Sequence, residues 1–171
     1  MAELTQKERL QPSLLDRLTD DEPHTSVESR DKRVLSLRAL RKSVLRDLGW
    51  LLNANNLASV VPLDDYPEVA HSVVNFGVPE FTGHAASNID ITAMELLIRQ
   101  AVWDFEPRLI RNTVRIFVHA DEQKMSHNAL TFDIEGELWA QPVPEQVYLK
   151  TELDLETGSV SIQDTHGFGV S

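Results

Sequence analysis

The chain has 171 residues, of which 42% are hydrophobic and 25% charged, with no cysteine and a formal net charge of −11. A chain of this length folds as one domain and buries about two-thirds of its unfolded surface, so its core needs no disulfide or metal. The missing cysteines exclude a disulfide framework, a thiol nucleophile and a cysteine-ligated zinc site. The acidity argues against binding to nucleic acid, because contacts with the phosphate backbone depend on Lys and Arg.

The first residues of the chain carry charges throughout and include no apolar segment typical of a signal peptide. Nowhere do about 18 apolar residues follow one another, as a transmembrane helix requires. We therefore expect a cytoplasmic protein that does not insert into a membrane.

Residues 1–28 are predicted to form an N-terminal tail. Within it, the segment PSLLDRL at 12–18 predicts one or two helical turns that carry Leu14, Leu15 and Leu18, and the polar stretch that follows predicts a flexible linker. An isolated helix this short is unstable. We expect it either to dock on its own domain or to bind in a groove of a partner, and the sequence leaves these alternatives equally open.

The next segment predicts a long amphipathic helix. Between residues 29 and 53 apolar side chains recur every three or four positions. The outer face is basic, with seven Lys and Arg residues from Arg30 to Arg46. Because the rest of the chain is negative, we interpret this face as solvated or as a contact for an acidic protein rather than as a nucleic-acid site.

Two further helices follow. Pro67 suits the first position of a helix over residues 67–76, which Gly77 is predicted to end as a C-cap. Asp90 or Thr92 is predicted to cap a third helix, which ends near residue 105 because Pro107 disfavours helical geometry in the residue before it.

After Pro107 the apolar period changes from helical to alternating, which predicts strands. The predicted strands cover residues 113–118, 130–138, 147–155 and 159–163, with a turn at 156–158. Helices followed by strands predict an α+β domain over residues 29–165, in which N-terminal helices pack on one face of a C-terminal antiparallel sheet of three to four strands. Residues 166–171 are predicted to be a flexible C-terminal tail.

Motifs for metal or nucleotide chemistry are missing from the sequence. It contains no phosphate loop, dinucleotide fingerprint, HExxH, GxSxG or kinase signature. His119 and His127 flank a predicted hairpin connection near Asp121 and Glu122, but we interpret them as exposed loop residues because the set lacks a fixed geometry. We expect no metal site and no cofactor.

Glycoside hydrolysis is the catalytic alternative, because two carboxylates at a defined separation suffice for it. Glu106 could be the acid, and Asp133, Glu135 or Glu137 the second group. The last three alternate with core residues, so they face solvent, where nothing raises a carboxylate pKa. Arg108 close to Glu106 favours the ionised carboxylate, the opposite of what a general acid requires. We therefore predict no catalytic residues and a protein that is not an enzyme, with a peptidoglycan-cleaving glycosidase as the alternative.

Glu106, Pro107 and Arg108, which we call the Glu-Pro-Arg motif, stand at the junction between the last predicted helix and the first strand. One interpretation is a local ion pair that fixes this corner. The other is an interface contact, because a guanidinium recognises carboxylates in a bidentate manner. Both can hold together.

Five segments resemble, in consistent order, the TssE family of baseplate subunits of the bacterial type VI secretion system, which is related to a phage-tail baseplate wedge protein. They are SLLDRL at 13–18, RDLGWLLNANN at 46–56, HSVVNFGVPEFTG at 71–83, IRQAVWDFEPRL at 98–109 and FDIEGELWAQPVPEQVYLKTELDLETGSV at 132–160. The resemblance implies a structural component of a contractile injection machine. It also implies a fold like the handshake part of the sheath protein, through which sheath subunits exchange strands.

The same resemblance implies partners and places for them. The implied partners are the wedge proteins TssF, TssG and TssK and the sheath proteins TssB and TssC, at a cytoplasmic baseplate on the inner side of the cell envelope. The family's motif associated with wedge contacts corresponds to the Glu-Pro-Arg motif of this chain. The leucines at 14, 15 and 18 fit docking on a wedge protein.

The terminal hairpin is the predicted site of strand exchange with the sheath. By accepting or donating a strand, it would start the assembly of the sheath. The candidate residues of this segment are Val147, Leu149, Leu153 and Leu155.

Overall fold

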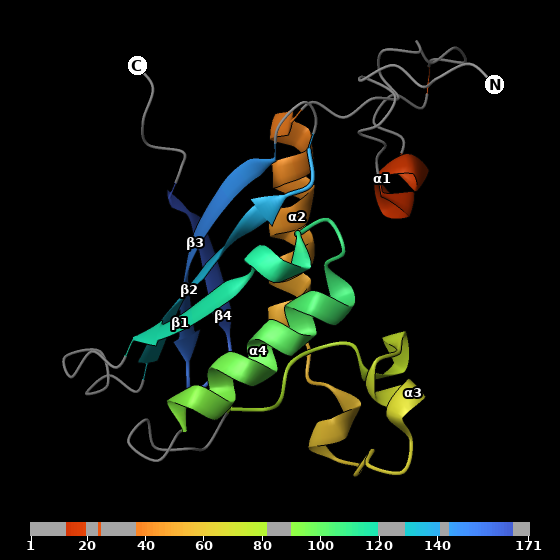
Figure 1. Ribbon diagram of the computed structural model, residues 1–171, viewed down its shortest axis with the longest axis vertical. Helices are drawn as coiled ribbons and strands as arrows, with labels where there is room; N and C mark the ends of the chain where they lie inside the picture. The colour runs from red at the N-terminus through yellow and green to blue at the C-terminus, as the bar shows by residue number, and fades with distance from the viewer. Residues whose placement is uncertain are drawn as a thin grey trace.

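A computed structural model of the protein describes residues 13–19, 24, 37–81, 90–119, 129–140 and 144–165. The α-helices are α1 (Leu14–Leu18), α2 (Leu37–Leu52), α3 (Pro67–Ala70) and α4 (Ile91–Phe105), and the 3-10 helices are η3 (Leu57–Ser59), η4 (Val73–Asn75) and η6 (Arg111–Thr113). The strands are β1 (Arg115–His119), β2 (Ala129–Leu138), β3 (Glu145–Asp154) and β4 (Val160–Asp164). Figure 1 shows the arrangement, which confirms the predicted α+β class.

The four strands form one antiparallel sheet in the order β1-β2-β3-β4, so strands that are consecutive in the sequence are neighbours in space. Every second side chain of β2 and β3 is buried, as the twofold period of a strand with one covered face requires. Helices α2 and α4 pack on this face and share its hydrophobic core (Figure 1). No helix among the described residues has both the length and the apolar character needed to cross a bilayer.

Helix α2 has the predicted amphipathic character. Leu40, Val44, Leu48 and Leu51 are buried at spacings of three or four residues, which aligns them on one side of the helix. The predicted residues before position 37 lie outside the described part of the chain. On the polar side, Arg41 binds residues of β3 and β4, so part of the predicted basic face is neutralised by the sheet.

Helix α4 begins and ends where the sequence predicts. The Asp90 carboxylate accepts a hydrogen bond from the backbone N–H of Ala93 at 3.1 Å, which makes Asp90 the N-cap. The helix ends at Phe105, and Glu106 is its C-cap. The turn before β4 is also confirmed, with Gly158 at a φ of 71°.

The second predicted helix is wrong in its length. Helix α3 starts at Pro67 as predicted but has only four residues, and the separate 3-10 helix η4 follows it. In a continuous helix the N–H of Val74 would donate to the carbonyl of Ala70. Instead it donates to the Ser72 hydroxyl at 3.3 Å, and the Ala70 carbonyl accepts from the Asn75 side chain at 2.8 Å. Polar side chains have replaced the helical hydrogen bond.

Candidate functional site: the Glu-Pro-Arg corner and the sheet edges

The Glu-Pro-Arg motif connects the end of α4 to the end of β2. The backbone N–H of Glu106 still donates to the last turn of α4, at 2.9 Å from the carbonyl of Val102. Two residues later the chain already pairs with β2, because Trp139 donates to the carbonyl of Arg108 and Ile110 donates to that of Glu137, both at 2.8 Å. The motif is therefore fixed at both ends by backbone hydrogen bonds.

Arg108 is bound on several sides. Its Nε donates to Glu106 Oε1 at 2.6 Å, and its Nη2 donates to the second oxygen of the same carboxylate. Nη2 also reaches Asp47 of α2 at 2.6 Å, and Nη1 donates to the Ser43 hydroxyl of α2 at 3.1 Å. Because the side chain of Glu106 is only 2% exposed, Arg108 is the cation that compensates its buried charge. The ion pair that fixes the corner is thus present.

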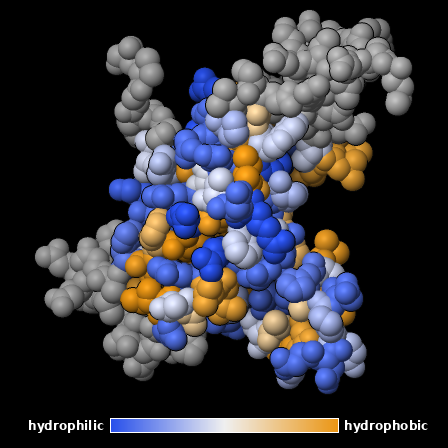
Figure 2. Space-filling model, viewed as in Figure 1, coloured by the Kyte–Doolittle hydropathy of each residue, from blue (hydrophilic) through white to orange (hydrophobic). Residues whose placement is uncertain are grey.

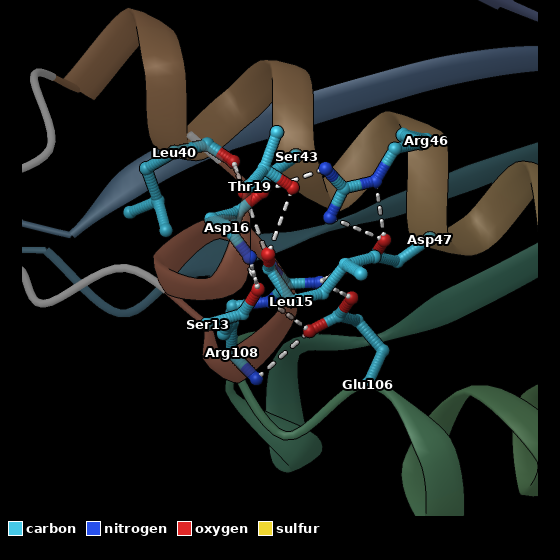
Figure 3. A network of polar contacts seen from close by, with 10 residues as sticks. All are labelled: Ser13, Leu15, Asp16, Thr19, Leu40, Ser43, Arg46, Asp47, Glu106 and Arg108. Atoms are coloured by element: carbon cyan, nitrogen blue, oxygen red, sulfur yellow. Dashed lines mark hydrogen bonds and ion pairs between the residues drawn. The ribbon is translucent and has the colours of Figure 1, made fainter. Parts of the chain in front are cut away.

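The polar contacts continue from α2 to α1. Arg46 donates to Asp47 at 2.8 Å through Nε and to Asp16 of α1 at 2.6 Å through Nη1. Asp16 also accepts a hydrogen bond from the hydroxyl of Ser13, which is the N-cap of α1. Figure 3 shows these groups meeting between α1, α2 and the motif. We call the set of Asp16, Ser43, Arg46, Asp47, Glu106 and Arg108 the corner network.

The contacts of the corner network shift the pKa values of Arg108 and Asp16. Burial works to lower the pKa of Arg108, but Glu106 and then Asp47 outweigh it, and the pKa is raised above its usual value. Burial likewise works to raise the pKa of Asp16, yet Ser13 and Arg46 lower it overall. A lowered carboxyl pKa means that the contribution of Asp16 is complete above pH 3.8, its ordinary pKa, and is lost as the pH falls through the lowered value.

Helix α1 is held on its own domain by this polar contact, and its leucines remain outside. Leu14 is 71% exposed, Leu18 73% and Leu15 42%. The two alternatives for the tail are therefore not exclusive in this structure, because docking in cis through Asp16 leaves the apolar side free for another protein.

The carboxylates weighed for glycoside hydrolysis do not meet. Glu106 is buried beneath Arg108 on the helix side of the sheet, whereas Asp133, Glu135 and Glu137 alternate with the core residues of β2 and lie on the other face. An open hollow of about 300 Å³ on that outer face is lined by Asp133, Glu135 and Lys150 among others, but not by Glu106. In the described part of the chain no group of three His, Asp or Glu residues could hold a metal ion.

The candidate strand-exchange residues lie in the middle of the sheet. Val147, Leu149 and Leu153 belong to β3, which pairs with β2 on one side and β4 on the other, and Leu155 follows it in the turn. All four side chains are buried in the core. Over residues 149–153, β3 is paired on both sides, so there a further strand can pair only with an outer strand.

One outer edge, that of β1, is bonded at Val118. The N–H of Val118 donates to the Glu95 carboxylate of α4 at 2.9 Å, so this group points away from β2. A side chain therefore takes the place that a further strand would need at this residue, whereas the backbone groups of Ile116, two residues earlier, also point outward.

The other edge, that of β4, is hydrogen-bonded to a side chain at its first residue, Val160. Both backbone groups of Val160 bond the Asn53 side chain, each at 2.9 Å, and so point away from β3. Antiparallel pairing alternates every second residue, so the N–H and C=O of Ile162 point to the same outer side. Among the described residues, no hydrogen bond engages these two groups of Ile162.

Sequence reasoning did not find several residues of these sites. Ser43 and Asp47 are four residues apart, so the sequence could have placed them on one side of α2, but not opposite Arg108 more than sixty residues later. For Asn53 and Glu95 we see no sequence signal, because a side chain that caps a sheet edge has no fixed spacing from the strand that it caps.

Comparison with protein families agrees with this architecture. A family model described as baseplate wedge protein gp25 matches residues 38–143, more than half of the chain, and includes the Glu-Pro-Arg motif. Searches of curated proteins and of solved structures give no match. TssE, which the chain resembles, is a member of the same family. The chain thus belongs to the gp25 family of baseplate wedge proteins.

Proposed function

We propose that the protein is the TssE subunit of a bacterial type VI secretion system and joins the cytoplasmic baseplate wedge to the first ring of the contractile sheath. Its wedge partners are TssF, TssG and TssK, and its sheath partners are TssB and TssC. The observation that carries the proposal is the outward-pointing backbone of Ile162 on the β4 edge, in a member of the baseplate wedge family.

The sheath contact follows from that edge. A strand from a sheath subunit adds to β4 at Ile162, where backbone groups point outward, whereas on β1 the Glu95 carboxylate occupies the outward N–H of Val118. Main-chain hydrogen bonds supply the affinity in this mode of binding. The strand-exchange segment predicted on β3 then acts as the buried support of β4 rather than as the contact itself.

The wedge contact is made by side chains rather than by main-chain hydrogen bonds. Helix α1 presents Leu14 and Leu18 to solvent while Asp16 holds the helix on the corner network. A partner that covers these leucines lies next to the Glu-Pro-Arg motif, so both predicted interface elements serve one wedge-facing surface. Pro107 is the exposed member of the motif.

The edge can be tested with Ile162→Pro, which removes an N–H that points outward and is therefore not hydrogen-bonded to the paired strand β3. We expect no sheaths in cells that carry this variant and a fluorescently labelled TssB. Ile162→Ala is the matched control, because it removes the side chain and keeps the N–H, and we expect it to form sheaths. Normal sheaths with a folded Ile162→Pro protein would overturn strand addition at this edge.

A structural role also means no catalysis, since both oxygens of Glu106 are engaged by Arg108. We expect the purified protein to release no fragments from peptidoglycan. Hydrolysis that disappears in Glu106→Gln would favour the glycosidase instead.

A further inference from the structure

Residues 55–78, which we call the closed loop, leave α2 and return to the same point. The N–H of Asn56 donates to the carbonyl of Val78 at 3.0 Å, and the N–H of Val78 donates to the carbonyl of Ala54 at 2.8 Å. Gly77 has a φ of 126°, and a Cβ there would lie 2.3 Å from the Ala54 oxygen. Only glycine permits this crossing, so the loop is closed by a specific residue.

The interior of the closed loop is organised by Asn75, which is buried. Its Oδ1 accepts from the N–H of Ala58 in η3 at 2.9 Å, and its Nδ2 donates to the carbonyl of Ala70 in α3 at 2.8 Å. One amide side chain therefore joins three short helices. Compact loops whose ends meet and whose interior is bonded are frequently functional.

The outer surface of the closed loop is unusually apolar. Val73 is 82% exposed, Val60 76%, Val74 64% and Tyr66 60%, although burial of a valine is favourable by about 1.5 kcal/mol or more. Figure 2 shows hydrophobic side chains among hydrophilic ones on this lobe, at the lower right of the molecule. Exposed apolar side chains gathered on one fixed element mark an interaction site.

The charges of the closed loop all have one sign. Asp64, Asp65 and Glu68 are exposed, and residues 55–78 contain no Lys or Arg. His71 is engaged by Asp104 of α4 at 2.8 Å. The surface thus combines exposed apolar side chains with exposed acidic ones.

We propose that the closed loop is a docking surface for a segment of another protein that carries apolar side chains flanked by Lys or Arg. Charge complementarity decides between occupants. If two copies of the chain docked through their closed loops, the acidic side chains of the two loops would repel each other. Anionic lipid would be repelled by the same side chains. The surface is separate from the corner network and from the β4 edge, so it does not depend on the function proposed above.

The test uses two synthetic amphipathic peptides of equal apolar content, one built from Leu and Lys and the other from Leu and Glu, titrated calorimetrically into the full chain. We expect the Leu/Lys peptide to bind and the Leu/Glu peptide not to bind. Val73→Asp with Val74→Asp should weaken Leu/Lys binding at least tenfold. Leu96→Asp with Leu97→Asp, the same change at exposed apolar residues of α4, should leave it unchanged.

The aspartate variants distinguish docking on the closed loop from nonspecific electrostatic attraction between the basic peptide and the acidic protein. Adding two negative charges strengthens nonspecific binding of a basic peptide, so equal or stronger binding by Val73→Asp with Val74→Asp would overturn the proposal. Asp64→Lys with Asp65→Lys keeps the valines and should shift preference toward the Leu/Glu peptide, which supports the proposal even if the first variant folds poorly. Dimerisation abolished by the valine changes, or flotation with phosphatidylglycerol vesicles, would identify a different occupant and overturn it.

Discussion

At the scale of single residues, the corner network explains how a buried carboxylate is tolerated. Glu106 lies at the end of a helix and is almost fully buried, a position that costs free energy unless a cation accompanies it. Arg108 is that cation, and it brings Ser43 and Asp47 of α2 with it. The Glu-Pro-Arg motif is therefore a structural corner, whatever else binds there.

Replacing Arg108 by Ala should lower the free energy of unfolding by about 3 kcal/mol, because it leaves Glu106 buried without a partner. We take the low end of the usual range, since the Arg108 side chain is 22% exposed and water partly screens it. Urea denaturation measures the loss, with Arg115→Ala on β1 as an exposed control expected within about 0.5 kcal/mol of the wild type. A loss below that of the control would make the motif an interface alone.

At the scale of elements, two glycines have opposite roles. Gly77 closes the loop with a positive φ and no room for a Cβ, whereas Gly49 lies inside helix α2 with nothing within 4 Å of a Cβ. The first glycine is required by a crossing of the backbone. The second only weakens a helix, because glycine gains more freedom than alanine on unfolding.

We therefore expect Gly77→Ala to destabilise the protein by about 1–3 kcal/mol, the strain of an alanine forced into this region. Gly49→Ala should stabilise it by about 0.5–1 kcal/mol. Chemical denaturation of the two variants in parallel gives both signs in one experiment. A neutral Gly77→Ala would show that the loop can open without cost.

At the scale of the whole molecule, the chain has a net charge of −11, and three of its arginines pair with carboxylates from different elements. Arg41, Arg46 and Arg108 each bind two carboxylates, which ties α1, α2, the motif and β4 into one body. Hydrogen bonding to Asp164 raises the pKa of Arg41 above its usual value. Exposed apolar side chains remain on α1 and on the closed loop, among other places.

Removing residues 1–20 should leave the melting temperature within about 3 °C of that of the full chain, because the Asp16–Arg46 pair is partly exposed and contributes at most about 1 kcal/mol. Binding to the purified wedge proteins should fall, since the exposed leucines are lost. Calorimetry and a pull-down check the two parts. A large drop in melting temperature, or unchanged binding, would contradict this role of the tail.

The sequence alone determined the elements that local signals control. Asp90 and Pro107 delimit α4, alternating apolar residues mark the strands, and Gly158 marks the turn before β4. These signals act over a few residues, through capping, period and backbone freedom, so they can be read without knowing the fold.

Only the tertiary structure decided what these elements meet. Alternation showed that β3 is half buried, but only the strand pairing showed that it lies between β2 and β4 and that the backbone groups of Ile162 point outward. Pro67 and Gly77 predicted a helix that continues through Val74, whereas the Asn75 side chain bonds Ala58, seventeen residues earlier, and the carbonyl of Ala70, where the helix ends. Arg108 donates a hydrogen bond to Asp47, which lies 61 residues earlier in the chain. Such contacts depend on how the chain closes in space, and no local period encodes that closure.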